Sequence, residues 1–459
     1  MTGASLSSQA LPRPFRGELG VALLAALVGL VAALLTVAAG ALALALPIAA
    51  AGAYALVRRP AVLLAVFLYI PFFESAPGLR ALPFDPTPVF AALMVIALVL
   101  RTGGTPLRRP PTGFLLPVLV IGVALLIGLL WTADSQYANE KVLKYLTVTL
   151  IAVLAPFAVL TTERALRQFL VTMVVGAVLV TVLTLILPPT IAAGIATEFD
   201  TRGRYSFGGQ IFPSRFLCTA ALIMFLVPGL TSSRWRWAAP VAAVGVILVA
   251  SGFGARGPIA AFGATMVAVI FVLALRSARH LAAVIAAVAI TAVAFPFLTV
   301  PDTASERIEE AARDPVATLR GDTRRVLYNQ ATTMIAGSPL LGEGTGSFAA
   351  YQAIVSPRGQ TLLYPHNIFL ELWAEIGIIP LLAFVVAVVG GVGTLMRRLV
   401  VTDDRRERQL LTLVFGLFIL NFFASQLSGD INDSRTTLLF LGLAWMVGRY
   451  GIGSERRSA

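Results

Sequence analysis

Long apolar runs recur from one end of this 459-residue chain to the other, and they leave few folds open to it. A helix that crosses the hydrocarbon core of a bilayer needs about 20 predominantly apolar residues. Lipid offers no hydrogen-bond partners to backbone N–H and C=O groups, so such runs must be helical. Only 13% of the residues are charged, against roughly 25% in a soluble domain. The pattern predicts an all-α, polytopic transmembrane protein.

We expect about 12–14 spans joined mostly by short connections. The candidate spans lie near residues 19–38, 41–57, 60–73, 86–100, 113–131, 142–160, 165–187, 211–230, 237–252, 257–275, 280–298, 367–396, 409–426 and 436–449. The third and fourth candidates are short. If they are re-entrant segments that do not cross the bilayer, the chain has 12 spans. One polar connection, residues 299–366, is by far the longest, and long loops are usually functional. We expect it to contain short helices.

The arginines give the chain an orientation. Only two of the 35 basic residues, Lys141 and Lys144, are lysines. With the N-terminus in the cytoplasm and alternating sides, the inner segments carry 21 basic and 6 acidic residues, and the outer segments carry 14 basic and 17 acidic ones. Basic residues concentrate in cytoplasmic connections. The net charge of +12 therefore indicates orientation, with both termini cytoplasmic, rather than binding to nucleic acid.

Several arginines break this inner bias and fall on the predicted outer side. They are Arg202, Arg204, Arg215, Arg256, Arg307, Arg313, Arg320, Arg324, Arg325 and Arg358. A guanidinium group close to the bilayer is costly unless it is paired, and it often marks a substrate path. Its planar fork binds phosphate oxygens bidentately, which suits a polyanionic ligand. The alternative is that these arginines have a structural role and pair with outer carboxylates such as Asp200 or Asp322.

One of the two histidines is well placed for chemistry. His280 follows inner arginines and is expected at the inner interface, whereas His366 stands where the long outer loop ends and the next span begins. Either His366 or Asn367 is expected to cap that helix. The alternative to a functional role is that His366 only caps the helix. Glu371 and Glu375 follow on one helical face, where they could orient His366 or pair with an arginine. The sequence contains no cluster of metal-ligand residues, and the single cysteine excludes a disulfide.

Three stretches in this region, taken together, resemble the O-antigen ligase and polymerase superfamily of bacterial surface-polysaccharide enzymes. Residues 251–257 are similar to the Ser-Arg-Gly turn of that family. Residues 324–348 are similar to its Arg-x-x-Leu-Trp element followed by Pro-Leu-x-Gly-x-Gly, with Tyr328 in place of tryptophan. Residues 365–377 are similar to its His-Asn…Glu-x-Gly stretch.

A fourth stretch, residues 204–214, is similar to the family's Arg…Gly…Pro-Asn loop, with Ser214 in place of asparagine. The matching core covers about residues 200–380. We therefore divide the chain into N-terminal transmembrane helices (1–200), an O-antigen ligase-like catalytic core with its outer loop 299–366 (201–380), and C-terminal transmembrane helices (381–459).

The resemblance implies an inverting, metal-independent glycosyltransferase without a cofactor. It would move an oligosaccharide or polysaccharide from undecaprenyl pyrophosphate to an acceptor sugar hydroxyl. Carried over by position, His366 would be the general base, and Arg204, Arg256 and Arg324 would bind the pyrophosphate. The residues expected to support them are Arg325, Asn367, Glu371 and Glu375.

The same resemblance implies the bacterial inner (cytoplasmic) membrane, with a multi-pass chain and the active site on the periplasmic or extracellular side. The implied partners are the lipid-linked glycan, an acceptor glycan or glycolipid, the lipid bilayer and a chain-length regulator protein. The motifs do not distinguish a ligase from a polymerase. A flippase is the alternative from another class, but transporter sites lie near the midplane between repeats, and no repeat is visible here. A further alternative is a membrane O-acyltransferase. Its acyl donor would have to be on the cytoplasmic side, opposite to the side predicted for this site.

Overall fold

The described part of the chain is all-α. The computed structural model describes residues 42–73, 86–100, 106–186, 211–226, 238–253, 255–274, 323–351, 364–427 and 429–452. Every regular element in these ranges is a helix, so the predicted fold class is confirmed there. The predicted spans at 19–38 and 280–298, and most of the loop 299–366, lie outside the described residues.

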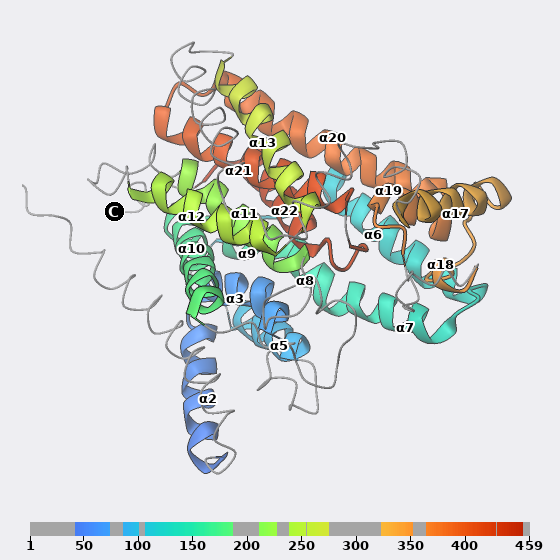
Figure 1. Cartoon of the computed structure of the whole chain (residues 1–459), viewed down its shortest axis with the longest axis horizontal. Coiled ribbons are helices and arrows are strands. Elements are labelled where there is room, and N and C mark those ends of the chain that lie inside the picture. The colour runs from blue at the N-terminus through green and yellow to red at the C-terminus, as the bar shows by residue number, and fades with distance from the viewer. Residues whose placement is uncertain are drawn as a thin grey trace, which may run out of the picture.

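The helices begin and end close to the predicted spans (Figure 1). They are α2 (Leu42–Val57), α3 (Pro60–Phe73), α5 (Pro86–Val99), α6 (Thr112–Ile127), α7 (Ser135–Lys144), α8 (Leu150–Leu154), α9 (Pro156–Val159), α10 (Glu163–Ile186), α11 (Ile211–Leu226), α12 (Ala238–Gly252), α13 (Arg256–Ala274), α17 (Thr323–Gly337), α18 (Phe348–Tyr351), α19 (Ile368–Ile376), α20 (Ile378–Val401), α21 (Arg405–Ser425) and α22 (Arg435–Tyr450). A short 3-10 turn extends α6 to Leu130, and a π-helical turn, Tyr145–Thr149, joins α7 to α8.

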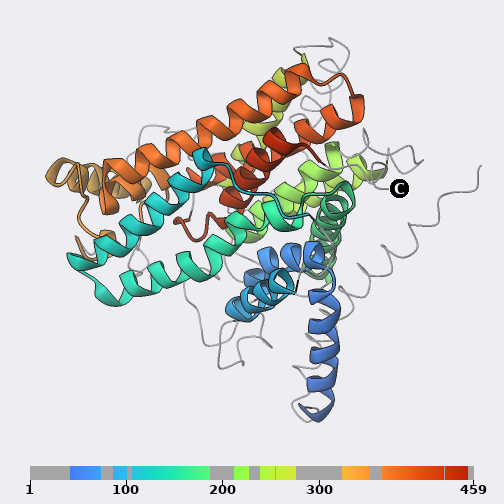
Figure 2. The ribbon, with the colours of Figure 1, turned by 180° about the vertical axis from the view of Figure 1, so that it is seen from behind.

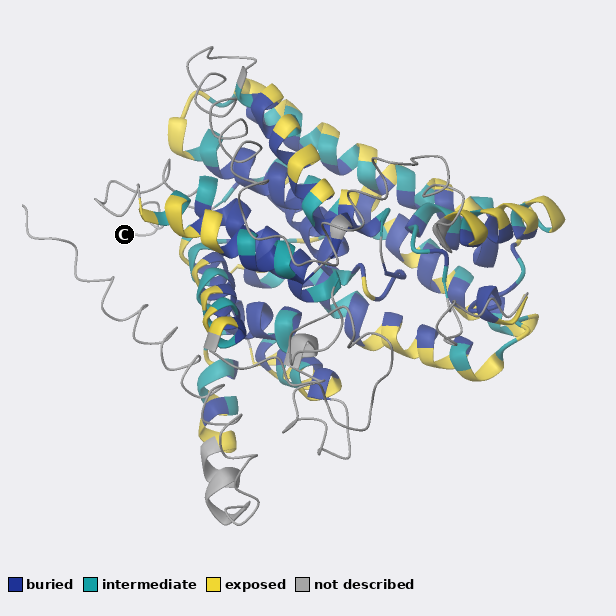
Figure 3. Cartoon of the chain, viewed as in Figure 1, coloured by how far each residue is buried: buried dark blue, intermediate teal, exposed yellow. Residues whose placement is uncertain are grey.

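Several of these helices have the length and composition of membrane spans. Five are long and apolar enough to cross a bilayer: Thr112–Leu130, Ser135–Val159, Glu163–Leu185, Ile378–Val401 and Arg405–Ser425. Shorter apolar helical segments cover Pro60–Ile70, Pro86–Val99, Ile211–Leu226, Ala238–Gly252 and Gly257–Leu273. The outer faces of the bundle carry exposed residues around a buried interior (Figure 3). On α20 the exposed residues include Ile379, Leu382, Val386 and Val389, as expected of a helix that faces lipid. The polytopic class is thereby confirmed.

One predicted span is interrupted. The run over 367–396 was expected to be a single helix, which is wrong, because Gly377 separates the nine-residue α19 from α20. Gly377 has φ +87° and ψ −177°, a backbone conformation that is essentially restricted to glycine. An added Cβ there would lie 2.0 Å from the carbonyl O of Leu340. The break lets the turn after α17 pack against the α19–α20 junction.

The helix ends gather into two groups. The helix α20 lies along α6 and α22, and α17, α18 and α19 sit together near one end of the molecule (Figures 1 and 2). At that end the Thr132 hydroxyl donates to the Thr345 carbonyl O at 2.6 Å. At the other end the Tyr450 hydroxyl donates to the Arg109 carbonyl O at 2.7 Å. Segments expected on the same side of the membrane therefore contact each other, as an alternating chain requires.

Candidate functional site

Asn367 is the residue that caps α19. Its Oδ1 atom accepts hydrogen bonds from the backbone N–H of Phe369 at 3.0 Å and of Leu370 at 3.1 Å. These bonds satisfy two of the helix's unpaired N-terminal donors. His366, the other residue expected as a cap, takes no part in capping, so its imidazole is available for other contacts.

His366 has an unusual backbone conformation. Its φ of +57° is the only positive φ of a non-glycine residue in the described part of the chain. Such a conformation costs on the order of 1–3 kcal/mol and persists where surrounding structure imposes it, often at functional sites. Here it turns the chain sharply between Pro365 and the Asn367 cap, and the ring lies against a connection far away in the sequence.

That connection, residues 429–434 between α21 and α22, faces the His366 ring. The backbone N–H of Gly429 points at Nδ1 with an N···N distance of 3.4 Å. The Tyr364 ring packs edge-on against the imidazole, with centroids 4.7 Å apart, and the Tyr364 hydroxyl donates to Asp433 at 3.3 Å. Burial, followed by the negative charges of Asp433 and Asp430, raises the pKa of Tyr364 well above its ordinary value. The phenol therefore stays protonated and acts as the donor.

A buried ion cluster lies farther along α19. The Nζ atom of Lys141 lies 2.5 Å from Glu371 Oε1 and 2.6 Å from Glu375 Oε2, and all three side chains are at most 2% exposed. Glu371 and Glu375 share one helical face, as predicted. The cation beside both is this lysine from α7 and not an arginine, so the expected arginine pairing is wrong, while a role in orienting His366 stays a prediction.

Two backbone N–H groups and one side-chain amide also bind this cluster. Glu371 Oε1 accepts from the Ile431 N–H at 3.3 Å, and Glu375 Oε2 accepts from the Gly346 N–H at 2.9 Å. The Lys141 carbonyl O accepts from Asn432 Nδ2 at 3.0 Å. The Lys141 cluster, meaning Lys141, Glu371 and Glu375, thus ties α7 and α19 to two connections.

The glycine-rich turn over residues 342–346 is one of these connections, and it docks on the C-terminal end of α19. The Glu343 N–H donates to the Ala374 carbonyl O, and the Gly344 N–H donates to the Glu375 carbonyl O, both at 2.9 Å. Gly342 has φ +71°, and an added Cβ would lie 2.4 Å from the Glu375 carbonyl O. The Pro-Leu-x-Gly-x-Gly stretch therefore serves as a packing element that buttresses the helix after His366.

The arginines expected to bind pyrophosphate are only partly covered by the structure. Arg204 lies outside the described residues. Arg256 begins α13 and Arg324 lies in the first turn of α17, but their side chains are not described. Arg325 is exposed on α17. Their roles therefore remain predictions.

The helix α17 itself is fixed near the site. The hydroxyl of Tyr328, at 3.4 Å, and Nδ2 of Asn367, at 3.3 Å, both lie within hydrogen-bond range of the Gln426 carbonyl O. Leu327 packs with Phe348 and Ala374 in a small core. The replacement of tryptophan by Tyr328 thus leaves α17 packed against the end of α21.

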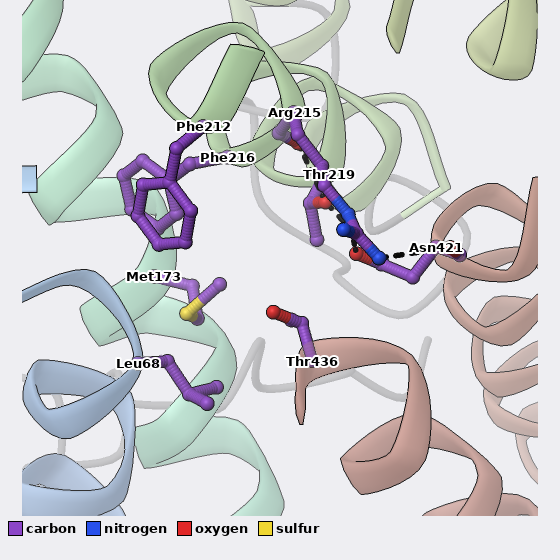
Figure 4. A pocket seen from close by; sticks show the side chains of 8 residues that line it. All are labelled: Leu68, Met173, Phe212, Arg215, Phe216, Thr219, Asn421 and Thr436. Carbon is purple, nitrogen blue, oxygen red and sulfur yellow. Dashed lines mark hydrogen bonds between the residues drawn. The ribbon is translucent and has the colours of Figure 1, made fainter. Parts of the chain in front are cut away.

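Arg215, another predicted outer arginine, joins helices together (Figure 4). It is buried on α11, and its Nη2 atom donates to the Asn421 carbonyl O at 2.9 Å and to Thr437 Oγ1 at 2.5 Å. Its Nε atom donates to Asn421 Oδ1 at 3.2 Å. These bonds connect α11 to α21 and α22 beside a narrow cleft that Phe212 and Phe216 also line.

The part of the site that sequence reasoning missed is Lys141 with the 429–434 connection. A signal was present in both cases. Lys141 is one of only two lysines in the chain, and the sequence Gly-Asp-Ile-Asn-Asp is a polar insertion between two apolar runs. Neither signal indicates a partner, because the contacting residues lie 60 or more positions apart along the chain.

The fold and the site together define a polytopic α-helical membrane protein with a buried polar cluster between α7 and α19. Among the described residues, no group of three or more His, Cys, Asp and Glu side chains could hold a metal ion. Residues 246–385, less than a third of the chain, match the family model described as O-antigen ligase. The resemblance to the O-antigen ligase and polymerase superfamily, a family of membrane glycosyltransferases, is thereby confirmed over that segment. No curated protein matches the chain.

Proposed function

We propose that this protein transfers an oligosaccharide or polysaccharide from undecaprenyl pyrophosphate to an acceptor sugar hydroxyl, with inversion and without a metal. The observation that carries the proposal is His366. It lies within the segment that matches the O-antigen ligase family, in a strained left-handed conformation, beside the 429–434 connection.

In this reaction His366 acts as the general base. A sugar hydroxyl is a poor nucleophile, and an imidazole with an ordinary pKa near 6.5 can accept its proton at neutral pH. The oxygen attacks the anomeric carbon as the bond to the pyrophosphate breaks, and the lipid pyrophosphate leaves with the bonding electrons. Attack from the side opposite the leaving group inverts the anomeric centre. Arg204 and Arg256 stabilise the charge that develops on the pyrophosphate, with Arg324 as the third arginine.

The proposed setting is the bacterial inner membrane. The site lies on the periplasmic or extracellular side and both termini are cytoplasmic, which the arginine distribution supports. A lipid-linked donor accounts for a polar site beside helices with exposed apolar faces. The proposed partners are the lipid-linked glycan, an acceptor glycan or glycolipid and a chain-length regulator protein.

The direct test is an assay of the purified protein in nanodiscs with defined undecaprenyl-pyrophosphate-linked oligosaccharides and candidate acceptor glycans. Formation of a glycosidic product, with release of undecaprenyl pyrophosphate in equal amount, is expected without added metal and in the presence of a chelator. Products extended on the lipid indicate a polymerase, and products on a different glycolipid indicate a ligase. Movement of the intact lipid-linked glycan across the bilayer without product would instead indicate a flippase.

The arginines provide a separate prediction. Arg204→Gln and Arg256→Gln are each expected to lower kcat by about 10²–10³-fold, the typical loss when one donor to a developing oxyanion is removed. Each is also expected to weaken binding of undecaprenyl pyrophosphate, measured with the purified variant. The matched control is Arg406→Gln, because Arg406 is exposed in the first turn of α21, in a connection predicted to be cytoplasmic, and pairs with Glu163. Wild-type rates in both variants would remove these arginines from the proposed site.

A further inference from the structure

We infer that the turn over residues 338–342, which lies within the segment expected as the outer loop, inserts its tip into the headgroup interface of the bilayer. Its partner is phospholipid. Only the name of the leaflet, the outer one, rests on the proposed function, because the insertion itself does not depend on glycan transfer.

Two consecutive leucines form the tip of this turn. Leu340 and Leu341 are 68% and 62% exposed, and residues 337–342 contain no charged side chain. Turns that face water are dominated by Gly, Pro, Asn, Asp and Ser. Exposed apolar patches commonly mark protein or membrane interaction sites. The leucine pair is therefore a candidate surface for an apolar partner.

The backbone of the 338–342 turn is fixed, so the leucines point outward. The Gly342 N–H donates to the Ser338 carbonyl O at 2.9 Å, and the Ser338 hydroxyl donates to the Gly342 carbonyl O at 2.9 Å. The indole N–H of Trp373 donates to the Pro339 carbonyl O at 3.0 Å, and that of Trp131 donates to the Gly342 carbonyl O at 3.2 Å. The two tryptophans thus hold the turn on either side of the leucine pair.

Two candidate membrane spans end beside this turn. Thr112–Leu130 has 19 residues, and at 1.5 Å per residue it is about 28 Å long, close to the hydrocarbon thickness of a bilayer. Trp131 follows it directly. The span Ile378–Val401 begins after Gly377, where an added Cβ would lie 2.0 Å from the Leu340 carbonyl O. The turn therefore lies at the level where both spans leave the hydrocarbon core.

The exposed apolar stripes of these two spans lead to the leucine pair. The helices α6 and α20 lie along each other and end near α17 (Figures 1 and 2). Each has exposed apolar residues three or four positions apart, on one face: Leu116, Leu119, Val123, Ile127 and Leu130 on α6 and its extension, and Ile379, Leu382, Val386 and Val389 on α20. The turn continues this lipid-facing surface, and tryptophan is enriched at that depth. This continuity selects the bilayer as the partner.

The helix before the turn has a different surface. The exposed residues of α17 include Arg325, Asn329 and Thr333, with Val326 as an apolar exception. This face suits water, so insertion is restricted to the turn. Because the segment after the turn is bonded to the C-terminal end of α19, the inserted leucines also fix the depth of the helix that follows His366.

Depth-dependent fluorescence quenching in nanodiscs of phosphatidylglycerol and phosphatidylethanolamine tests the inference. The chain has a single, buried cysteine, Cys218, so a Cys218→Ala background accepts one environment-sensitive fluorophore at Leu340→Cys or Leu341→Cys. We expect the label to be quenched most by a nitroxide carried near the lipid headgroup. Quenching by aqueous iodide should be several-fold weaker than at Thr333→Cys, the water-facing control on α17.

A second control calibrates the depth. Leu382 lies one turn inside the span on α20, so a label at Leu382→Cys should be quenched most by a nitroxide in the middle of the acyl chain. Iodide quenching at Leu340→Cys and Leu341→Cys equal to that at Thr333→Cys would overturn the inference. Protection from both iodide and the lipid nitroxides would also overturn it, because a protein partner or a second copy would then cover the turn.

A label-free measurement covers the case in which the cysteine variants fail to fold. Lipids brominated near the headgroup should quench wild-type tryptophan fluorescence more strongly than that of Trp131→Phe, since Trp131 lies at the predicted interface. Equal fractional quenching in the two proteins would count against insertion. Neither measurement uses glycan transfer, so a failed transfer assay would refute the proposed function and leave this result unchanged.

Discussion

A His366→Ala variant is expected to lower kcat for glycan transfer by about 10²–10⁴-fold, the usual contribution of a positioned general base. The acceptor hydroxyl would keep its proton in the transition state, since no second histidine is expected at that side of the membrane. Binding of the lipid-linked donor should change little, because the pyrophosphate is assigned to arginines. Initial rates at saturating donor, together with donor affinity measured by titration, separate these two effects.

The other histidine supplies the control for this prediction. His280→Ala removes an imidazole from the position expected at the inner interface and should leave kcat within about two-fold of wild type, as most surface substitutions do. Full activity in His366→Ala would exclude the base assignment. Lost binding together with lost translocation in vesicles would favour the flippase alternative.

The helix boundaries were predictable because bilayer physics is local. An apolar run must be helical when no water can satisfy its backbone, so the runs at 41–57 and 165–187 correspond closely to α2 and α10. The start of α7 was harder to predict from the sequence. Its polar residues, Ser135–Lys144, do not extend the apolar run at 142–160, and Asp134 starts the helix by accepting from the Tyr137 N–H.

The break at Gly377 was not predictable from hydropathy. The surrounding residues Ile376, Ile378 and Ile379 are all apolar, and an isolated glycine is tolerated in transmembrane helices. The positive φ follows from a long-range contact, the packing of the 338–342 turn against the junction. A single sequence carries no information on that contact.

Part of the site was predictable because several of its residues are close together in the sequence. His366, Asn367, Glu371 and Glu375 are close in sequence, so their placement along one short helix and its N-terminal cap followed from their spacing, and the shared face of the two glutamates from the 3.6-residue period. The cation between the two glutamates comes from a helix more than 200 residues earlier. Charge alone favoured an arginine as their partner, since 33 of the 35 basic residues are arginines. A buried lysine forms a compact point charge on a flexible stem, which suits two carboxylates one helical turn apart.

The two ends of the His-Asn…Glu-x-Gly stretch, residues 365–377, contact different connections. His366 meets the 429–434 connection at its N-terminal side, and Glu375 meets the glycine-rich turn through the Gly346 N–H. The same nine-residue helix therefore fixes the base to one connection and the buttressing turn to another. Its length is set by Asn367 at one end and Gly377 at the other. A change at either end should disturb both connections.

Gly377→Ala should accordingly be among the most destabilising substitutions in the chain. Alanine would have to adopt the glycine-only backbone conformation, with its Cβ 2.0 Å from the Leu340 carbonyl O, and the two effects together should cost about 3 kcal/mol or more. The thermal unfolding midpoint in detergent should fall and transfer activity should be largely lost. Gly393→Ala is the matched control, since a Cβ there meets nothing within 4 Å on α20 and alanine favours a helix by up to about 1 kcal/mol. Equal midpoints for Gly377→Ala and wild type would show that α19 and α20 do not need this break.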